Sequence, residues 1–224
     1  IAASTEEIAA VSMLTVFMVF APFNGFRLVA VVSALVWLGS SPSSLPQNAR
    51  VDQPEIRVWD VGQGLSVLVR HGREVLVYDT GPAVPGVFSA VESTLLPTLK
   101  AEGIHRIDTL VISHGDSDHA GGVSELAEQV EIGRVVAGET GAIRNQIPGV
   151  PIVPCERATE TFGALTIDYW QGEGASEGND ASCVIRIHHP ESGIEWILPG
   201  DITESVESQY LAFLSVGGKL RHSG

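Results

Sequence analysis

The sequence predicts an α/β fold with mixed sheets over residues 55–224, preceded by an apolar helical segment. Short runs rich in β-branched residues, separated by glycine-containing turns, open this part of the chain and are typical of strands. A nearly continuous apolar run at 107–112 is typical of a strand that is covered on both faces of its sheet. Helical periodicity then alternates with strand patterns, which is the order of elements in α/β domains.

The predicted elements follow from turn residues and apolar periodicity. Strands at 56–61, 65–69 and 75–79 are separated by glycine-containing turns. Apolar side chains recur on one face of residues 88–101, which predicts a helix that is kinked at Pro97. The remaining predicted elements are the strand at 107–112, a helix at about 122–130, strands at 134–136 and 162–170, a hairpin of 183–187 with 194–198, and a helix at 203–214.

Composition excludes two classes of protein. The chain has 13 basic and 27 acidic side chains, and residues 1–50 are neutral, so the net charge of -14 falls on residues 51–224. Because 44% of the residues are hydrophobic, the chain can bury a core and is no disordered acidic tail. Histone-like binding of nucleic acid is also excluded, since such binding needs a net basic face.

The first 38 residues are predicted to be a membrane helical segment. Two apolar runs, 8–23 and 28–38, are each shorter than the roughly 20 residues that span a bilayer, and together they are longer than one span needs. Two short helices or one long kinked helix would fit, and a helix packed on the body is the alternative. Because the chain starts with Ile1, we expect a fragment of a longer, multi-pass membrane protein. Residues 39–54, rich in Ser and Pro, are predicted to be a linker.

A cluster of metal-ligand residue types directly follows the buried strand at 107–112. His114, Asp116, Asp118 and His119 lie within six residues, at a strand end where open α/β sheets bind ligands. Imidazole nitrogen and carboxylate oxygen suit Zn²⁺, Mn²⁺ or Fe. Capping of the next helix would explain one aspartate, but it leaves the other three side chains without a role. The cluster therefore predicts a metal site.

Several motifs carry a resemblance to a known family. The segment Tyr78–Gly81, the 114–119 cluster with Gly121-Gly122 after it, and Gly200-Asp201 after an apolar strand resemble the motifs of metallo-β-lactamase-like hydrolases. Asp116, where most such proteins have His, narrows the resemblance to the C-terminal domain of the ComEC family, the competence channels for DNA uptake. The segments 60–64, 179–182 and 198–202 also match that family. The resemblance implies an αββα sandwich.

The resemblance also implies a two-metal centre with divalent ions, Zn or Mn. By this likeness, His114 and Asp116 hold one ion, Asp118 and His119 hold the second, and Asp201 bridges the two. Asp118 and Asp201 are then the catalytic carboxylates. Asp79 lies behind the ligands and orients the ligand loop.

The family further implies an activity and a setting. The domain is expected to hydrolyse phosphodiester bonds of the DNA strand that is not imported, with single-stranded DNA as substrate. Its expected partners are the membrane, the rest of the channel and other DNA-uptake proteins. The expected location is the bacterial inner membrane. If Arg27 marks a cytoplasmic turn, residues 51 onward lie on the extracytoplasmic side.

Two departures from the family pattern open alternatives. The third-motif His is missing, and Asn179 or Asp180 could supply an oxygen ligand in its place. A terminal His motif is also missing, since no strand precedes His222, so residues 55–224 are expected to form a domain that lacks its last motif. A catalytically degenerate module of the channel is therefore one alternative, and a generic ester or lactone hydrolase is another.

The two cysteines permit at most one disulfide. Cys155 and Cys183 are too few for a disulfide framework or a cysteine-rich metal site. Cys183 falls in an apolar strand, so we expect it to be a small buried hydrophobe.

Overall fold

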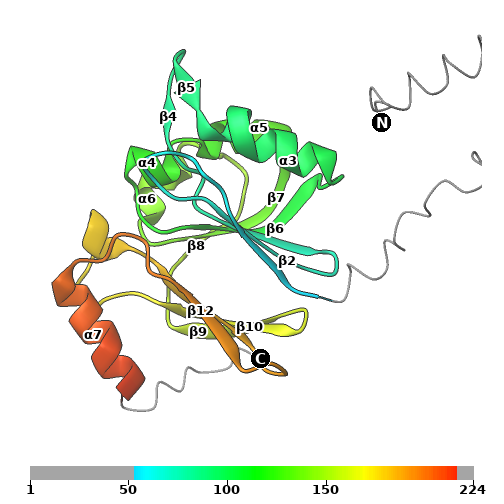
Figure 1. Cartoon of the computed structure of the whole chain (residues 1–224). Coiled ribbons are helices and arrows are strands. Elements are labelled where there is room, and N and C mark those ends of the chain that lie inside the picture. Colours follow the sequence, from blue (N-terminus) through cyan, green and yellow to red (C-terminus); the bar gives the residue numbers. More distant parts are fainter. Residues whose placement is uncertain (1–52, 216–224) are drawn as a thin grey trace, which may run out of the picture. The chain divides into compact units, whose positions relative to one another are not determined.

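The computed structural model describes residues 53–215, which form a two-sheet sandwich with helices on its outer faces (Figure 1). The chain divides into two units, residues 1–49 and 50–224. The predicted membrane segment at 1–38, most of the predicted linker at 39–54 and His222 lie outside the described residues. Among residues 53–215, no helix is both long enough and apolar enough to cross a bilayer.

The first sheet has six strands in the order β1-β2-β3-β6-β7-β8. β1 to β3 form an antiparallel meander, whereas β3, β6, β7 and β8 run parallel to one another. The strands are β1 (Glu55–Val58), β2 (Val67–His71), β3 (Glu74–Tyr78), β6 (Arg106–Ile112), β7 (Glu131–Ala137) and β8 (Ile152–Pro154). The sheet is therefore mixed, as the sequence predicts.

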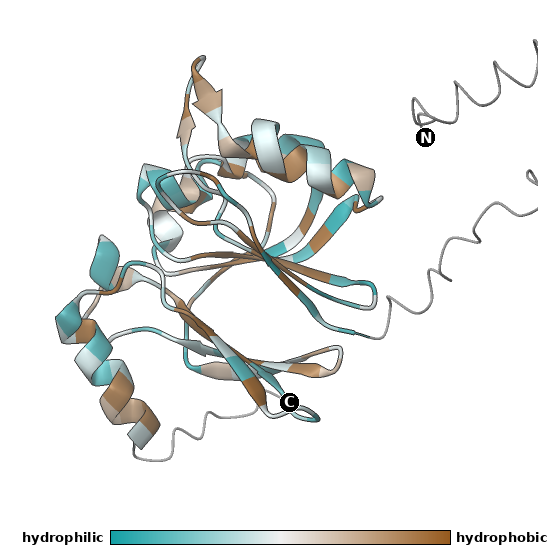
Figure 2. Cartoon of the chain, viewed as in Figure 1, coloured by the Kyte–Doolittle hydropathy of each residue, from teal (hydrophilic) through white to brown (hydrophobic). Residues whose placement is uncertain are grey.

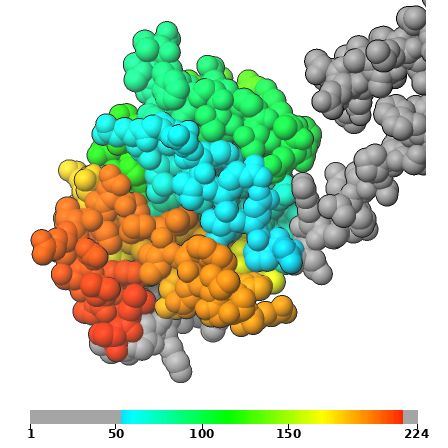
Figure 3. All heavy atoms as spheres, in the orientation of Figure 1, coloured from blue at the N-terminus to red at the C-terminus, as the bar shows by residue number. Residues whose placement is uncertain are grey.

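The second sheet has four antiparallel strands in the order β12-β11-β10-β9. They are β9 (Ala158–Phe162), β10 (Leu165–Trp170), β11 (Val184–His189) and β12 (Ile194–Leu198). A small hairpin, β4 (Ala83–Val84) with β5 (Phe88–Ser89), projects from the body as a separate knob (Figure 3).

Three apolar clusters correspond to the layers of the sandwich. One packs helices against the six-stranded sheet, with Leu99 and Leu126 of the helices and Leu110 and Val135 of the strands among its members. The second fills the space between the sheets, where the facing strands carry apolar residues (Figure 2). The third holds the last helix on the second sheet through Tyr210. Helices thus cover both outer faces, which is the αββα arrangement.

The helices are short except for the last. They are the π-helix η2 (Val91–Leu95), α3 (Leu96–Ala101), α4 (Ser117–Ala120), α5 (Val123–Gln129), α6 (Thr140–Arg144), the 3₁₀-helix η3 (Asn179–Ala181) and α7 (Glu204–Ser215).

Two predicted elements are wrong in part. Residues 88–101 do not form one kinked helix, because the segment starts as a strand, continues as the π-helix η2 and becomes α-helical only from Leu96. Pro97 lies in the first turn of α3, directly after the π-helix η2. The predicted strand at 162–170 is two strands, because Gly163 has a positive φ of 57° and turns the chain between β9 and β10.

Candidate metal centre

The candidate centre lies where the ends of several strands meet. β3 and β6 are parallel neighbours, so Asp79 after β3 lies beside the Ser113–His119 loop after β6. In the second sheet, β11 and β12 are antiparallel, so Ser182 before β11 lies beside Asp201 after β12. The fold therefore brings four separate segments of the chain to one place.

Three of the predicted ligands lie together. His114, His119 and Asp201 each offer a ligand atom within 4.8 Å of the others, and the two imidazole centroids are 4.4 Å apart. His119 Nε2 is 3.3 Å from Asp201 Oδ1, and His114 Nε2 is 3.4 Å from Asp116 Oδ2. Both imidazoles are buried, whereas the side chains of Asp116 and Asp201 are 57% and 44% exposed. Nitrogen donors thus lie at the bottom of the centre and carboxylates at its mouth.

Asp79 is a buried carboxylate behind these ligands. Its Oδ1 accepts the Ser113 amide at 2.7 Å, and its Oδ2 accepts the Ser113 hydroxyl at 2.7 Å. His119 Nδ1 is also 2.7 Å from Oδ2. Its backbone has a φ of 58°, which is uncommon for a residue other than glycine and is often found at functional sites. Asp79 therefore holds the ligand loop in position.

Burial and the neighbouring groups shift the pKa values of Asp79 and His119. Burial raises the pKa of Asp79, although hydrogen bonds from His119 and Ser113 favour its ionised form. Burial lowers the pKa of His119, but the hydrogen bond and charge of Asp79, together with the charges of Asp201 and Asp118, outweigh burial and raise it.

The hydrogen bonds also select the tautomer of each imidazole. Because the carboxylate of Asp79 can only accept, His119 carries its proton on Nδ1 and leaves Nε2 as a lone pair. The Ser113 hydroxyl donates to Asp79, so its oxygen accepts from His114 Nδ1, 3.0 Å away. Ser182 Oγ is a further neighbour of His114 Nδ1, at 3.4 Å. In both imidazoles Nε2 is therefore the nitrogen whose lone pair is free to bind a metal.

The surroundings of the His114 Nε2 atom indicate whether a metal fits this centre. It is buried and has no hydrogen-bond partner among the described residues, although it lies near Asp116. An unpaired buried nitrogen costs free energy unless something binds it. Two imidazole Nε2 atoms and nearby carboxylate oxygens are the donors that divalent metals such as Zn²⁺ take. The residues present therefore fit a divalent cation.

Not all predicted site residues join the cluster. Asp118 lies in α4, and its charge acts on His119, but it is not among the three residues that cluster within 4.8 Å. Asp180 instead accepts the amide and the hydroxyl of Thr203, at 3.3 and 2.5 Å. Asn179 is exposed at the start of η3. Ligand roles for Asp118, Asn179 and Asp180 remain predictions.

Residues that the sequence reasoning missed support the centre from outside. Glu139 follows β7, accepts the amide of Gly178 at 2.9 Å and also accepts the amide of Gly115. A Cβ atom at Gly115 would lie 2.6 Å from the Glu139 carboxylate and 2.9 Å from the Cβ atom of Ala142, so a larger residue here would displace the Glu139 side chain. One signal could have identified Glu139, since it lies at the carboxyl end of a parallel strand next to β6.

Cys155 and Cys183 form a disulfide. The expectation that Cys183 is buried is confirmed, but its sulfur is bonded to Cys155, so it is no free thiol in the core.

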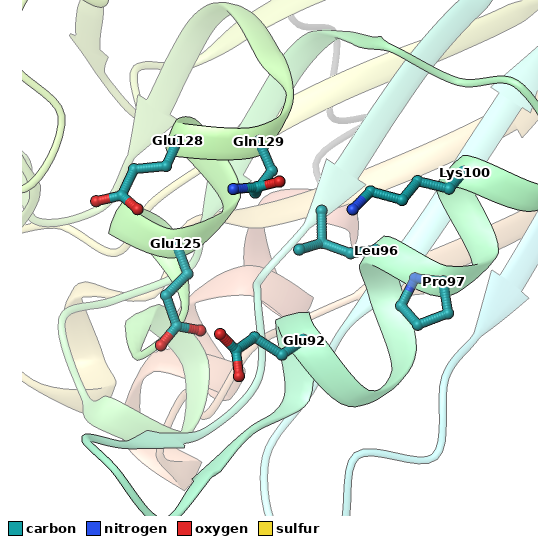
Figure 4. A pocket seen from close by; sticks show the side chains of 7 residues that line it. All are labelled: Glu92, Leu96, Pro97, Lys100, Glu125, Glu128 and Gln129. Carbon is teal, nitrogen blue, oxygen red and sulfur yellow. The ribbon is translucent and has the colours of Figure 1, made fainter.

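A pocket among the helices that cover the six-stranded sheet shares no residue with this centre. It has a volume of about 320 Å³ and lies between the η2–α3 segment and α5 (Figure 4). Glu92 and Glu125 point toward one another in it, and Lys100 lines its other end. Carboxylates line it but no histidine does, so it lacks the imidazole donors of the metal centre.

Comparison with known proteins agrees with this fold. The model of the metallo-beta-lactamase superfamily matches residues 59–197. Competence protein ComA of Neisseria gonorrhoeae is 37% identical over 115 residues, covering 51% of this chain and 15% of the relative. ComE operon protein 3 of Bacillus subtilis is 33% identical over 184 residues, covering 70% and 23%. Recombination protein 2 of Haemophilus influenzae is 42% identical over 72 residues, covering 32% and 9%.

The chain thus spans less than a quarter of the length of each of these relatives. Among solved structures, a metallo-beta-lactamase from Cronobacter sakazakii with a mutated HARLDQ motif has 22% identity and a TM-score of 0.46, covering 65% of this chain and 62% of that one. The diiron beta-hydroxylase CmlA from Streptomyces venezuelae has 19% identity and a TM-score of 0.48, covering 74% and 33%. The chain belongs to the metallo-beta-lactamase superfamily, and the branch of it that its sequence matches is the C-terminal domain of the ComEC family of competence proteins.

Proposed function

We propose that this chain carries the metal-dependent hydrolase domain of a DNA-uptake protein and cleaves phosphodiester bonds of the strand that is not imported. Two independent facts support the proposal. The relatives are named for competence and recombination, and the described residues bring two imidazoles and carboxylates to one set of strand ends. The observation that carries it is the buried, unpaired Nε2 atom of His114.

Zn²⁺ or Mn²⁺ is the proposed cofactor, with two ions in the intact site. The resemblance assigns His114 and Asp116 to one ion, Asp118 and His119 to the second, and Asp201 to both. The approach of His114, His119 and Asp201 within 4.8 Å supports a different assignment, in which these three would hold one ion and Asp116 and Asp118 are the carboxylates left for a second. A bound divalent cation supplies a Lewis acid for the phosphoryl oxygen and lowers the pKa of coordinated water. Asp118 and Asp201 are the proposed catalytic carboxylates.

The residues of the chain prepare this site before any substrate arrives. Asp79 and Ser113 fix the two imidazole rings, so both Nε2 atoms are free. The exposed carboxylates of Asp116 and Asp201 open the centre to solvent, where a polymer can approach. The net charge of -14 opposes DNA binding, so the chain depends on bound cations to attract phosphate and binds DNA weakly by itself.

The proposed location is the outer side of the bacterial inner membrane. The apolar runs at 8–23 and 28–38 support membrane attachment. The Cys155–Cys183 disulfide supports an oxidising compartment, since disulfides persist there and are rare in the cytosol. The proposed partners are single-stranded DNA, the rest of the channel and other DNA-uptake proteins.

The test combines metal analysis with hydrolysis assays on the purified full chain. We expect about two equivalents of Zn or Mn and cleavage of single-stranded DNA, with no turnover of a lactone. Asp201→Asn should lower DNA cleavage by roughly 100-fold or more, because the metal supplies several kcal/mol of charge stabilisation. Glu207→Gln, an exposed change on α7, is the matched control.

Each other outcome separates the alternatives. A chain that binds metal but cleaves only lactones is a generic hydrolase. A chain that binds no metal and cleaves nothing contradicts the proposal, and the domain is then a structural module of the channel without catalytic activity.

A further inference from the structure

The Cys155–Cys183 disulfide joins the two sheets of the sandwich. Cys155 directly follows β8 of the six-stranded sheet, and Cys183 directly precedes β11 of the four-stranded sheet. Both cysteines are buried within the cluster that fills the space between the sheets. These are the only cysteines of the chain, so this bond is the only disulfide that the chain can form.

The backbone of Cys183 is held at the candidate metal centre. Its amide donates to the carbonyl of Ser113 at 2.8 Å, and its carbonyl accepts the hydroxyl of Tyr78 at 2.8 Å. Ser113 immediately precedes His114, and Tyr78 immediately precedes Asp79. The disulfide thus fixes a point that touches both segments of the six-stranded sheet that build the centre.

The residue before Cys183 contacts two proposed ligands. The buried Ser182 has its hydroxyl oxygen 3.4 Å from His114 Nδ1, and this oxygen accepts the amide of Asp201 at 3.2 Å. A Cβ atom at Gly200 would lie 2.8 Å from the same hydroxyl oxygen, so the fit here is tight. A shift of Ser182 would therefore move His114 and Asp201 relative to one another.

Hydrogen bonds from the Cys183 amide to Ser113, from the Tyr78 hydroxyl to Cys183 and from the Gly178 amide to Glu139 also hold the segment before β11, but the disulfide is its covalent attachment. The β10–β11 ladder starts at the pair Trp170–Val184, so residues 171–183 lie outside the sheet. On the other side, the amide of Cys155 bonds to the carbonyl of Ala137 at the end of β7. The covalent bond thus ties the segment before β11 to the parallel strands of the first sheet.

We propose that the Cys155–Cys183 disulfide positions Ser182 against His114 and Asp201, so that the metal affinity of the centre depends on the redox state of this cysteine pair. The inference rests on the proposed metal site. Formation of the bond releases two protons and two electrons from two thiols, and a dithiol–disulfide oxidoreductase in its disulfide form takes them up and becomes the dithiol. The domain then reaches its full metal affinity only after oxidation.

The experiment is a Co²⁺ titration of the full chain, read by the visible absorption of the bound ion. The double variant Cys155→Ala/Cys183→Ala should bind Co²⁺ roughly 10- to 100-fold more weakly, with a shifted absorption spectrum, as when a residue that orients a ligand is lost. Ser182→Ala, which keeps the disulfide, should weaken binding in the same direction. Leu165→Ala is the matched control, because it opens the same inter-sheet core at the far end of β10.

The outcomes distinguish this inference from the proposed function. If the wild type binds Co²⁺ and the cysteine variant has the same affinity and spectrum, the inference is wrong while the metal site stands. An unchanged affinity in Ser182→Ala also overturns it, even if the cysteine variant fails to fold. If Leu165→Ala weakens Co²⁺ binding as much as the cysteine variant does, the disulfide acts only through the general stability of the core, and the positioning role is overturned. A wild type that binds no Co²⁺ overturns the metal site and this inference with it.

Discussion

The Nδ1 atom of His119 lies 2.7 Å from the Oδ2 atom of Asp79, and both side chains are buried. When the Asp79 carboxylate is ionised it can only accept, so this contact keeps the proton of His119 on Nδ1 and leaves Nε2, which is 3.3 Å from Asp201 Oδ1, with a free lone pair. Asp79 also fixes Ser113, which in turn faces His114. One carboxylate that is not in the ligand cluster therefore orients both imidazoles that are.

Asp79→Asn should weaken metal binding by roughly 10- to 100-fold. The amide nitrogen of Asn must face either His119 or Ser113, and both of them donate hydrogen bonds, so one donor is left opposite another. Metal titration of the variant and the wild type measures the effect. Glu74→Gln is the control, since it is exposed at the other end of the same strand. Equal affinities of Asp79→Asn and the wild type would mean that Asp79 does not orient the ligands.

Metal affinity should fall as the pH is lowered. A proton on His119 Nε2 excludes a metal, and the pKa of His119 is raised above its usual value despite the opposing effect of burial. Competition between proton and metal should therefore begin at a higher pH than for an ordinary histidine, whose pKa is about 6.5. In Asp79→Asn, which lacks the charge that raises this pKa, the fall should shift to lower pH. Titrations between about pH 6 and 8 would show this, and a flat profile would argue against His119 as a ligand.

Which parts of the centre could be predicted depends on how far apart they lie in the chain. His114 and His119 follow closely after a strand with a clear apolar run. One short motif therefore predicts both that they are metal ligands and that they lie at the end of this strand. Asp201, far along the chain, was predicted only through the resemblance to a family. Its meeting with His119 depends on the pairing of β11 with β12 and on the packing of the two sheets.

The supporting residues were missed for a related reason. Ser182 ends the 179–182 segment that matches the family, but the match gave it no role, and Glu139 lies in no recognisable motif. The contacts of both residues depend on how the 171–183 segment lies over the end of β7. The wrong helix at 88–101 has a local cause. Its apolar periodicity is real, but a π-helical turn and the β5 strand interrupt the segment. Periodicity reports which face is buried and does not fix the hydrogen-bonding pattern.

Glu139→Gln should loosen the loop that carries His114. The two carboxylate oxygens of Glu139 each accept one amide, from Gly115 and from Gly178. Gln keeps one acceptor and presents an NH₂ group to the other amide, which leaves a donor unpaired at a cost of about 1–3 kcal/mol. We expect a lower free energy of unfolding and faster hydrogen exchange of the Gly115 amide. Glu128→Gln, exposed on α5, is the control. Equal exchange rates of the Gly115 amide in the two variants would show that Glu139 does not hold the loop that carries His114.

The pair of Asp168 and Arg186 on the outer face of the second sheet gives a prediction that is independent of the metal. The two residues are directly opposite one another on β10 and β11, and Arg186 donates to Asp168 Oδ2 at 2.8 and 3.0 Å. Asp168 also accepts the hydroxyl of Thr159 and is nearly buried. Arg186→Met should lower the free energy of unfolding by about 2–3 kcal/mol, because it leaves the Asp168 carboxylate without its charged partner. The loss is smaller than for a fully buried pair because Arg186 is partly exposed.

The double variant Asp168→Leu/Arg186→Met should recover most of that loss, since no charge is then left unpaired. Urea unfolding of the four proteins in a double-mutant cycle gives the coupling energy of the pair. The metal affinity should be the same in all four, because the pair lies on the face of the second sheet that points away from the first sheet and the candidate centre. A double variant as unstable as Arg186→Met would show that the lost stability comes from the packing of the arginine stem and not from the stranded charge of Asp168.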